Sequence, residues 1–348
     1  MRVFLRKGRH PMNGYYMGYE PKGVQYIEEA RQDSMSGKAG WGRRLWKYYT
    51  RFRPAAVSLD EMLMIYRPDM VHSNNLMIMN RIPWVMDLED VGTLSNFHYD
   101  KLEHNGYRTM ILKLLGNPRC KRIMPHTEAA KRSIEAEFPE IKDKLEVVYP
   151  AIDIPKQKKA KHGGIKFLFV GNRYYERGCQ FIEQAFKEIK TKHDVELQMV
   201  HGLPRDMLYN AVYPTSDVFL FLGHFDTFGF AQLEAMSFGM PVIGIDQYAE
   251  REIVKDGKTG FLLQTPFTRD RFPQYTTPKE REDFMKRTPN RDLVEQIVQK
   301  CSLLIKDTKL RKRMGENARK EIESGRFSIR KRNEKLKRIY EEATCSGR

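Results

Sequence analysis

Short, almost wholly apolar runs alternate with longer amphipathic stretches along most of the chain. Residues 217–221 (DVFLF) and 242–245 (VIGI) are typical of strands buried on both faces of a parallel sheet. The same pattern predicts strands at residues 3–5, 68–72, 83–88, 123–125, 146–149, 166–170 and 195–200. Strands that alternate with helices indicate an α/β protein built on parallel sheets.

Helical periodicity fills much of the sequence between these runs. Residues 180–190 place their apolar side chains on one side, and residues 24–30 and 230–238 also predict helices. Residues 293–340 are predicted to be mostly helical, with an interruption near residues 324–325.

Composition divides the chain into two halves. Residues 155–164 (PKQKKAKHGG) are charged and end in two glycines, which is typical of a linker. We therefore predict an N-terminal domain over residues 1–154 and a C-terminal domain over residues 165–315. Residues 316–348 are predicted as a C-terminal helix that packs back toward the N-terminal domain. Residues 264–289, rich in charge and proline, are predicted to be an irregular insertion.

The stretch DTFGFAQLEAMSFGMPVIGID, residues 226–246, predicts a helix followed by a buried strand. The loop at residues 223–229 lies between the carboxyl end of one strand and the start of this helix, which is where open α/β sheets bind ligands. Free N–H groups at a helix N-terminus favour a phosphate, and Gly229 allows it to approach the backbone. The carboxylates of Asp226 and Glu234 suit hydroxyl groups. Phosphate and hydroxyls together indicate a nucleotide sugar.

Charge and cysteine content narrow the class of protein. The 348 residues carry a formal net charge of +16, which points to an anionic partner. The four cysteines lie far apart without a CxxC pair, so neither a zinc site nor a disulfide framework is expected. No apolar run reaches the roughly 18–20 residues that span a bilayer, and the N-terminus is too charged for a signal peptide. We expect a cytoplasmic protein.

Three stretches resemble the retaining glycosyltransferases of family 4: FLFVGNRYYERGCQFIEQAF, residues 226–246, and REIVKDGKTGFLL at residues 251–263. In the first half, YRPDMVHSN and KLEVVYPAIDIP resemble the family more loosely. The resemblance implies the GT-B fold, in which two Rossmann-like domains face each other across a cleft and helices end the chain. It also implies hexosyl transfer from a nucleotide sugar of the UDP or GDP type, with retention of configuration.

The resemblance also implies roles for individual residues. Glu234 matches the glutamate that holds the donor ribose. Asp226 stands one methylene shorter where the family has a glutamate near the donor sugar. Asn172 takes the place of the family's loop arginine, with Arg173 next to it, and Arg177 takes the place of its lysine. The expected donor-binding residues are Gly23, Gly171, Asn172, Phe228, Gly229 and Glu234.

The predicted chemistry needs no metal and no cofactor beyond the sugar donor. As the glycosidic bond breaks, the leaving diphosphate gains charge, which fixed cations and helix N–H groups stabilise. Arg173, Arg177 and the amides near Gly229 are placed for this role, and the sequence has no Asp-x-Asp motif. Other interpretations remain: Arg173 and Arg177 as solvated surface cations, Glu234 as a surface helix residue, and Asp226 as a helix N-cap.

Three polar residues mark an acceptor side in the first half. Glu89 and Asp90 follow an apolar strand where the family has a histidine–aspartate pair, and Glu89 is the candidate to orient or deprotonate the acceptor hydroxyl. His126 lies where a strand gives way to a helix that Thr127 is expected to cap. The alternatives are a loop acid pair and a structural histidine. His72, on a buried strand, is interpreted as structural.

Residues 37–54 (GKAGWGRRLWKYYTRFRP) mix basic and aromatic side chains and contain no acid. That composition fits an anionic lipid surface, a phosphorylated acceptor, single-stranded nucleic acid, or a basic helix with its aromatics in the core. The candidate contact residues are Trp41, Arg43, Arg44, Trp46, Lys47 and Arg51.

The leading hypothesis is therefore a glycosyltransferase that acts on a glycan or lipid-linked acceptor, peripherally on the inner face of a membrane. A nucleotide-sugar epimerase of the same fold is the first alternative. A non-catalytic protein that binds nucleotide sugars or nucleic acid is the second, although no RRM, KH or helix-turn-helix signature is present, so nucleic acid is not an expected partner.

Overall fold

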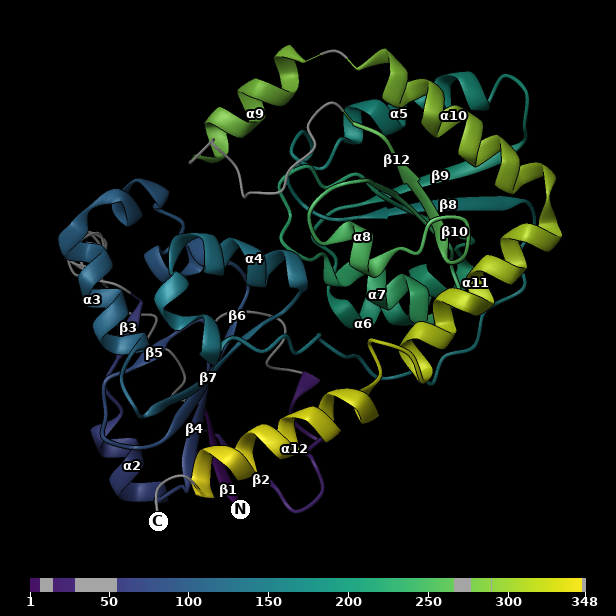
Figure 1. Ribbon diagram of the computed structural model, residues 1–348. Coiled ribbons are helices and arrows are strands. Elements are labelled where there is room, and N and C mark those ends of the chain that lie inside the picture. The colour runs from purple at the N-terminus through teal and green to yellow at the C-terminus, as the bar shows by residue number, and fades with distance from the viewer. Residues whose placement is uncertain (7–14, 29–54, 266–276, 289, 346–348) are drawn as a thin grey trace, which may run out of the picture. The chain divides into compact units, whose positions relative to one another are not determined.

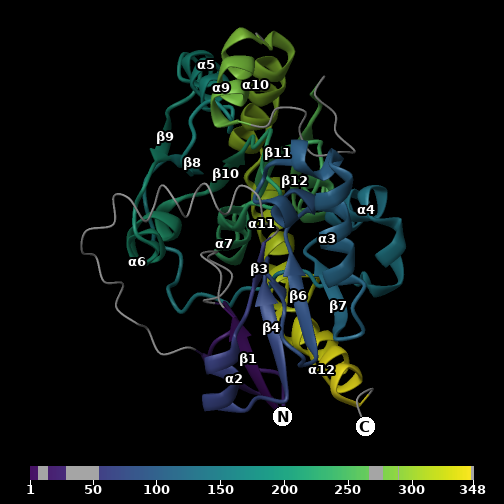
Figure 2. The same cartoon turned by 90° about the vertical axis from the view of Figure 1, so that its left-hand side faces the viewer.

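The computed structural model describes residues 1–6, 15–28, 55–265, 277–288 and 290–345. The chain forms two compact units (Figures 1 and 2). The first unit comprises Met1–Pro150 and Arg332–Arg348, and the second comprises Ala151–Lys331. Residues 155–164, predicted as a linker, fall within the second unit.

The first unit contains a parallel sheet that has five strands among the described residues, in the order β2-β1-β4-β6-β7. The strands are β1 (Arg2–Arg6), β2 (Gln25–Glu28), β4 (Met70–Asn74), β6 (Trp84–Leu88) and β7 (Cys120–Pro125). The pair β3 (Ala56–Val57) and β5 (Met77–Ile78) forms a separate short sheet. The helices are α2 (Asp60–Tyr66), η2 (Val91–Ser95), η3 (Tyr99–Glu103), α3 (Asn105–Leu115), α4 (Glu128–Glu137), η4 (Pro139–Lys144) and the end of α12 (Ile329–Cys345).

Two predictions in the first unit are wrong. Residues 24–30 were expected to begin a helix, but Gln25–Glu28 forms strand β2 and pairs in parallel with β1. Tyr26 and Ile27 favour strands, and pairing with β1 outweighs the helical pattern of the stretch. Residues 146–149 form no strand, although Glu146 and Val148 donate backbone hydrogen bonds to the chain at β7, with N–O distances of 3.0 Å each.

The second unit repeats the same arrangement with a sheet ordered β12-β11-β10-β8-β9 among the described residues. Its strands are β8 (Ile165–Val170), β9 (Val195–Val200), β10 (Val218–Phe221), β11 (Val242–Ile245) and β12 (Gly260–Leu263). Its helices are α5 (Cys179–Ile189), α6 (Arg205–Met207), η5 (Leu208–Val212), η6 (Tyr213–Thr215), α7 (Phe230–Ser237), α8 (Glu250–Ile253), α9 (Pro278–Arg287), α10 (Arg291–Lys306) and α11 (Thr308–Glu323). Figure 1 shows α5 and α10 on one face of this sheet and α7 with α11 on the other.

Sequence periodicity predicted most of the second unit correctly. The apolar face of α5, which includes Phe181, Ile182 and Phe186, is buried against the strands. Helix α7 ends before Gly239, whose φ of +75° confirms the expected left-handed position. Burial of these apolar faces is the main favourable term that holds the helices on the sheet.

The C-terminal half of the second unit departs from prediction in one place. Within the stretch expected to be irregular, α9 forms because Pro278 occupies its first turn and Thr277 caps it together with Glu280. The prediction that residues 293–340 are mostly helical is confirmed. Asn290 and Asp307 cap α10 and α11, and the helical structure is interrupted between the end of α11 and the start of α12.

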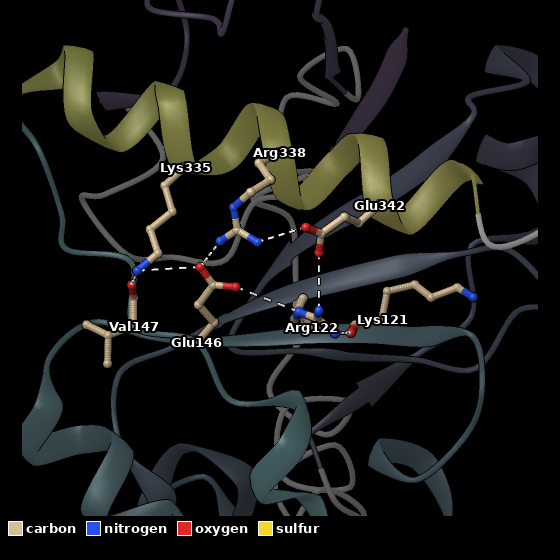
Figure 3. A network of polar contacts seen from close by, with 7 residues as sticks. All are labelled: Lys121, Arg122, Glu146, Val147, Lys335, Arg338 and Glu342. Atoms are coloured by element: carbon tan, nitrogen blue, oxygen red, sulfur yellow. Dashed lines mark hydrogen bonds and ion pairs between the residues drawn. The ribbon is translucent and has the colours of Figure 1, made fainter.

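Two sets of side-chain contacts hold helix α12, most of which belongs to the first unit, against the rest of that unit. A charged network (Figure 3) joins it to β7 and to the chain that follows η4, through the side chains of Arg122, Glu146, Lys335, Arg338 and Glu342. Glu146 is ion-paired with Arg338, and its contacts with Lys335 and Arg122 measure 3.5 and 3.7 Å. Each half-exposed pair contributes at most about 1 kcal/mol, so the network fixes register more than it adds stability.

A second set of α12 contacts, around Tyr340, is buried. His72 on β4 and Asp87 on β6 lie on the face of the sheet that α12 covers, while the apolar side chains of α3 pack on the opposite face. The Tyr340 hydroxyl lies 2.6 Å from His72 Nδ1, and His72 Nε2 lies 3.0 Å from Asp87 Oδ2. Tyr16 also donates to Asp87 Oδ2 at 2.9 Å. Although burial opposes its ionisation, the charge and hydrogen bond of His72 hold the pKa of Asp87 below its usual range.

Across the described part of the chain, no helix combines the length and the apolar character required to cross a membrane.

Candidate functional site

The second unit has its topological switch point between β8 and β10. The adjacent strands β8 and β10 lead to α5 and α7 on opposite faces of the sheet, and open α/β sheets bind ligands at the carboxyl ends of such a pair of strands. The loops that leave these strands carry Arg177 and Asp226. Arg177 Nη2 lies 3.0 Å from Asp226 Oδ1, and both side chains are about one-fifth exposed, at 21% and 23%. The structure therefore brings together two predicted catalytic residues at the carboxyl end of this sheet.

Two glycines make room for this pair. A Cβ atom at Gly171 would lie 2.2 Å from Arg177 Nη1, and one at Gly223 would lie 2.4 Å from Asp226 Oδ2. The Arg177 guanidinium also lies over the ring of Phe221, with 5.5 Å from its carbon to the ring centroid. A side chain at either glycine would displace the charged pair, so Gly171 has a steric function here.

The start of α7 leaves its backbone N–H groups without a side-chain cap. The N-cap residue is Gly229, in the left-handed conformation with φ of +81°, and no side chain makes a cap hydrogen bond. The interpretation of Asp226 as the N-cap of this helix is therefore wrong. A Cβ at Gly229 would lie 2.5 Å from the Phe221 ring, so only glycine fits. An anion at this turn would meet N–H groups and the positive end of the helix dipole.

Glu234, on the same helix, is buried rather than a surface residue, with 7% of its area exposed. Tyr213 donates to its Oε2 at 2.7 Å, and Arg205 Nε donates to its Oε1 at 3.0 Å. Arg205 in turn lies over the Tyr209 ring at 4.6 Å. These two hydrogen bonds hold the Glu234 carboxylate in a defined orientation.

Arg173 occupies an exposed position in the loop between β8 and α5, which also carries Arg177. Its φ is +66°, its side chain is 57% exposed, and its Nη1 lies 3.3 Å from Glu176 Oε2. Glu176 is buried and also contacts Arg281 Nη1 at 3.4 Å. Asn172, next to Arg173, is exposed. Because Arg281 shares the Glu176 carboxylate, the positive charge of Arg173 is only partly neutralised by this contact.

In the first unit, Glu89, Asp90 and His126 follow the carboxyl ends of the adjacent strands β6 and β7 and so lie at one edge of the sheet. Glu89 is partly buried, and its backbone N–H donates to Asn75 Oδ1 at 3.0 Å. His126 is buried, and Thr127 caps α4 by accepting from Ala130 N at 3.0 Å, as predicted.

Asp90 has a clear structural role. It caps η2, its Oδ1 accepting from Thr93 N at 3.2 Å and its Oδ2 accepting from the Tyr99 hydroxyl at 2.9 Å. Burial, reinforced by the charge of Glu89, raises the pKa of Asp90 to about 7. Both of its oxygens are thus already used within the chain, and a role toward an acceptor stays a prediction.

Gly23 does not lie at the carboxyl edge of the first unit's sheet. It precedes β2, and its carbonyl accepts from the N-terminal amine of Met1 at 3.0 Å, at the amino end of the strands. The reason is that residue 25 begins a strand instead of the expected helix, so Gly23 does not end a strand-to-helix loop. The candidate contact residues Trp41, Arg43, Arg44, Trp46, Lys47 and Arg51 lie outside the described residues.

Sequence reasoning missed the residues that support the site. Arg205, Tyr213 and Arg281 lie outside the stretches that carry the family resemblance, and Arg205 and Tyr213 contact a glutamate more than twenty positions away in the chain. Glu176 lies within the stretch FLFVGNRYYERGCQFIEQAF, but no role was predicted for it. The one sequence signal for this cluster is the pair of tyrosines at positions 209 and 213 (YNAVY), whose hydroxyl groups need hydrogen-bond partners when they are buried. Among the described residues, no group of three or more His, Cys, Asp or Glu side chains is arranged to hold a metal ion.

The sequence matches a family model described as glycosyl transferases group 1 over residues 196–275, which include Asp226, Gly229 and Glu234. A capsular polysaccharide biosynthesis glycosyltransferase of Staphylococcus aureus, CapM, is 26% identical over 196 residues, covering 49% of this chain and 44% of that protein. An uncharacterized 41.2 kDa protein in the cps region of Klebsiella pneumoniae is 25% identical over 150 residues, covering 35% of this chain and 42% of that protein. The matches thus span less than half the length of either relative.

Solved structures show the fold. Sucrose-phosphate synthase of Thermosynechococcus elongatus matches 99% of this chain and 89% of its own, with a TM-score of 0.60 at 13% identity. HepE of Anabaena, solved in complex with UDP, matches 98% of this chain and 99% of its own, with a TM-score of 0.58 at 14% identity. The predicted fold class is confirmed: the chain has an α/β GT-B fold with two Rossmann-like units.

Proposed function

We propose that this chain is a retaining hexosyltransferase that moves a sugar from a nucleotide-activated donor of the UDP or GDP type to an acceptor hydroxyl. The observation that carries the proposal is the Arg177–Asp226 pair at the switch point of the second unit, beside the uncapped start of α7. The match of residues 196–275 to the glycosyl transferases group 1 model supports it, as does the fold shared with a protein solved with UDP.

The geometry suggests a division of roles on the donor side. The N–H groups at Gly229 and the guanidinium of Arg177 would hold the diphosphate and stabilise the charge that it gains as the glycosidic bond breaks. Arg173 adds a second, exposed cation at the same loop. Asp226 would accept from a sugar hydroxyl, and Glu234 from the ribose hydroxyls. These groups act without a metal ion in the proposed mechanism.

On the acceptor side, the proposal is a glycan or lipid-linked hydroxyl, oriented or deprotonated by Glu89 at the carboxyl edge of the first unit's sheet. A relative named for capsular polysaccharide biosynthesis supports a glycan product. A cytoplasmic protein held peripherally on an anionic membrane would reach a lipid-linked acceptor.

The test is incubation of the purified chain with a panel of UDP-, GDP- and ADP-sugars, with and without glycan and lipid-linked acceptors. We expect one donor to release nucleotide in the presence of an acceptor, in EDTA as well as in magnesium. The anomeric configuration of the product, read by NMR, tests retention. A donor converted to another nucleotide sugar without nucleotide release would identify an epimerase instead. Absence of nucleotide binding to every donor and diphosphate would overturn the proposal, and activity lost in EDTA but restored by manganese would overturn its metal-free part.

A further inference from the structure

A buried amide–carboxyl pair contacts the turn that begins α7. Gln232, on the first turn of that helix, donates from Nε2 to the backbone oxygen of Phe228 at 2.9 Å and to Glu250 Oε1 at 2.5 Å. Both side chains are almost completely buried, with 0% of Gln232 and 5% of Glu250 exposed. Glu250 comes from a different segment, since it begins α8 after strand β11. The pair therefore ties the Phe228–Gly229 turn to the next strand-to-helix connection.

The chain makes space for this carboxyl group at a cost. A Cβ atom at Gly244 on β11 would lie 2.8 Å from Glu250 Oε2, so the glycine leaves the room that the carboxyl occupies. Oε2 is buried and makes no hydrogen bond to any described residue. An unsatisfied buried polar atom is unfavourable, and apolar side chains of similar volume would fill the same space without that penalty. Packing alone does not explain a glutamate here, whereas its link to the turn does.

The environment favours the neutral form of Glu250. Burial raises the pKa of Glu250 well above its usual value, and the charge of Asp226 raises it further, while the hydrogen bond from Gln232 opposes the shift. Gln232 on α7 and Gly244 on β11 bring no charge, so Asp226 is the charged group that acts on Glu250 from the loop after β10. An ionised carboxylate at this depth would have no cationic partner among the described residues, and the negative charge of Asp226 would oppose its ionisation.

We propose that Glu250 is a positioning residue: as a buried, uncharged carboxylic acid, it fixes the Phe228–Gly229 turn through Gln232 for a nucleoside diphosphate. This inference rests on the proposed function, because it assigns the turn to the donor phosphates. The acid form supplies a polar support without adding negative charge behind the phosphates. Ionisation at high pH would add a second negative charge to that of Asp226 and repel the diphosphate.

The first experiment reads the protonation state without any ligand. The infrared difference spectrum between the wild-type chain and Glu250→Gln at pH 7 should contain the carbonyl band of a protonated carboxylic acid. The control is Glu295→Gln, because Glu295 is 59% exposed and paired with Arg291. That control should instead remove a carboxylate band. A carboxylate band lost from Glu250→Gln at pH 7 would overturn the neutral assignment.

The second experiment measures UDP and GDP affinity by calorimetry in four folded variants. Glu250→Gln keeps the neutral shape and should bind within about twofold of wild type at pH 7, whereas Glu250→Ala and Gln232→Leu should bind roughly tenfold more weakly because the turn loses its support. Glu295→Gln should bind as wild type. At alkaline pH, where the Glu250 carboxyl group ionises, wild-type affinity should fall relative to that of Glu250→Gln, a comparison in which the titration of the diphosphate itself cancels.

The outcomes separate this inference from the proposed function. Glu250→Ala that is folded, by circular dichroism and thermal melting, and binds UDP and GDP as wild type would overturn the positioning role. A wild-type chain that binds no nucleoside diphosphate would instead overturn the proposed function, while the infrared result would still report the state of Glu250.

Discussion

The candidate site depends on a few side chains whose chemistry is set by single-residue choices. Asp226 replaces the glutamate that the family resemblance led us to expect, and Arg177 replaces a lysine. The structure gives a physical account of the two changes together: the longer arginine reaches the shorter aspartate, and Gly171 and Gly223 leave room for both. Neither distance nor pairing could be predicted from the sequence, because the two residues are 49 positions apart.

Arg177→Lys tests whether the guanidinium geometry matters. Lysine keeps the charge but lacks the planar fork that contacts Asp226 and lies over Phe221, so turnover should fall by roughly tenfold or more. The measurement is the rate of nucleotide release with donor and acceptor at saturation. Arg291→Lys, which alters an exposed arginine of α10, is the matched control. Equal turnover in both variants would remove Arg177 from the catalytic group.

Glu234→Ala should weaken nucleotide binding by at least about tenfold, because a hydrogen bond to a charged group is worth roughly 1.5–3 kcal/mol. The substitution also leaves Arg205 and Tyr213 without their shared acceptor. Glu234→Gln therefore serves as the control for packing: it keeps the shape and still loses much of the affinity. Calorimetry on folded protein decides, and unchanged affinity in both variants would show that ribose is bound elsewhere.

The raised pKa of Asp90 makes a signed prediction for stability. The folded chain keeps the proton up to about pH 7, whereas the unfolded chain releases it near its ordinary value of 3.8. Between these values the folded state binds more protons, so the free energy of unfolding falls as pH rises and then levels off above pH 7. Each pKa unit is worth about 1.4 kcal/mol, which gives a loss of a few kcal/mol over this window.

Asp90→Asn removes the titrating group and keeps an acceptor for Thr93 N. Its thermal midpoint should therefore gain on that of the wild type as pH rises from 4 to 7, with no further gain above pH 7. Parallel pH profiles for the two proteins would mean that Asp90 is ionised in the folded chain across this range.

At the scale of elements, the sequence predicted best those segments whose neighbours lie nearby in the chain. The βαβ segment from β10 to β11 follows directly from an apolar run, a helix of good formers and Gly239. The helix predicted for residues 24–30 was wrong because strand β2 is stabilised by pairing with β1, which local periodicity does not reveal. Helix α9 was missed because the charge and proline content of its surroundings concealed the capping box at Thr277.

Gly229→Ala tests the turn at the start of α7 as an element. The position has φ of +81°, and a Cβ would lie 2.5 Å from the Phe221 ring, so alanine must move the turn or the ring. We expect a destabilisation of about 1–3 kcal/mol and a larger proportional loss of nucleotide affinity. Gly257→Ala, where φ is +70° and a Cβ meets open space, is the control for backbone strain alone. A loss of affinity no greater than that of the control would argue against an anion site at the turn.

At the scale of the whole molecule, the two units share one strand order, in which the second strand of each sheet flanks the first and the third follows on its other side. No sequence repeat announces this, because the order of parallel strands depends on which side each connection crosses, and buried apolar runs look alike in any order. The fold class was therefore predictable from alternation and resemblance. The supporting contacts of the site were not predictable from the sequence, because Arg205 and Glu250 contact residues that are distant in the chain and that only the fold brings near them.

The net charge of +16 is also a property of the whole molecule, and it bears on the partners that the protein meets. The basic and aromatic segment at residues 37–54 predicts reversible attachment to an anionic lipid surface, since each basic residue near such a surface contributes about 1 kcal/mol and the attraction decays within a Debye length.

Wild-type protein should sediment with vesicles that contain anionic lipid at low salt and only weakly with neutral vesicles. Replacing Arg43, Arg44 and Lys47 together by glutamine should abolish sedimentation, whereas UDP or GDP affinity, which we propose for the second unit, should stay unchanged. A triple variant of the exposed helix cations Lys309, Lys312 and Arg313 removes the same charge elsewhere, so equal losses in both variants would show that net charge alone, and not this segment, drives attachment. If the wild-type chain ignores anionic vesicles even at low salt, the segment serves another anion, and a phosphorylated soluble acceptor becomes the better-supported substrate.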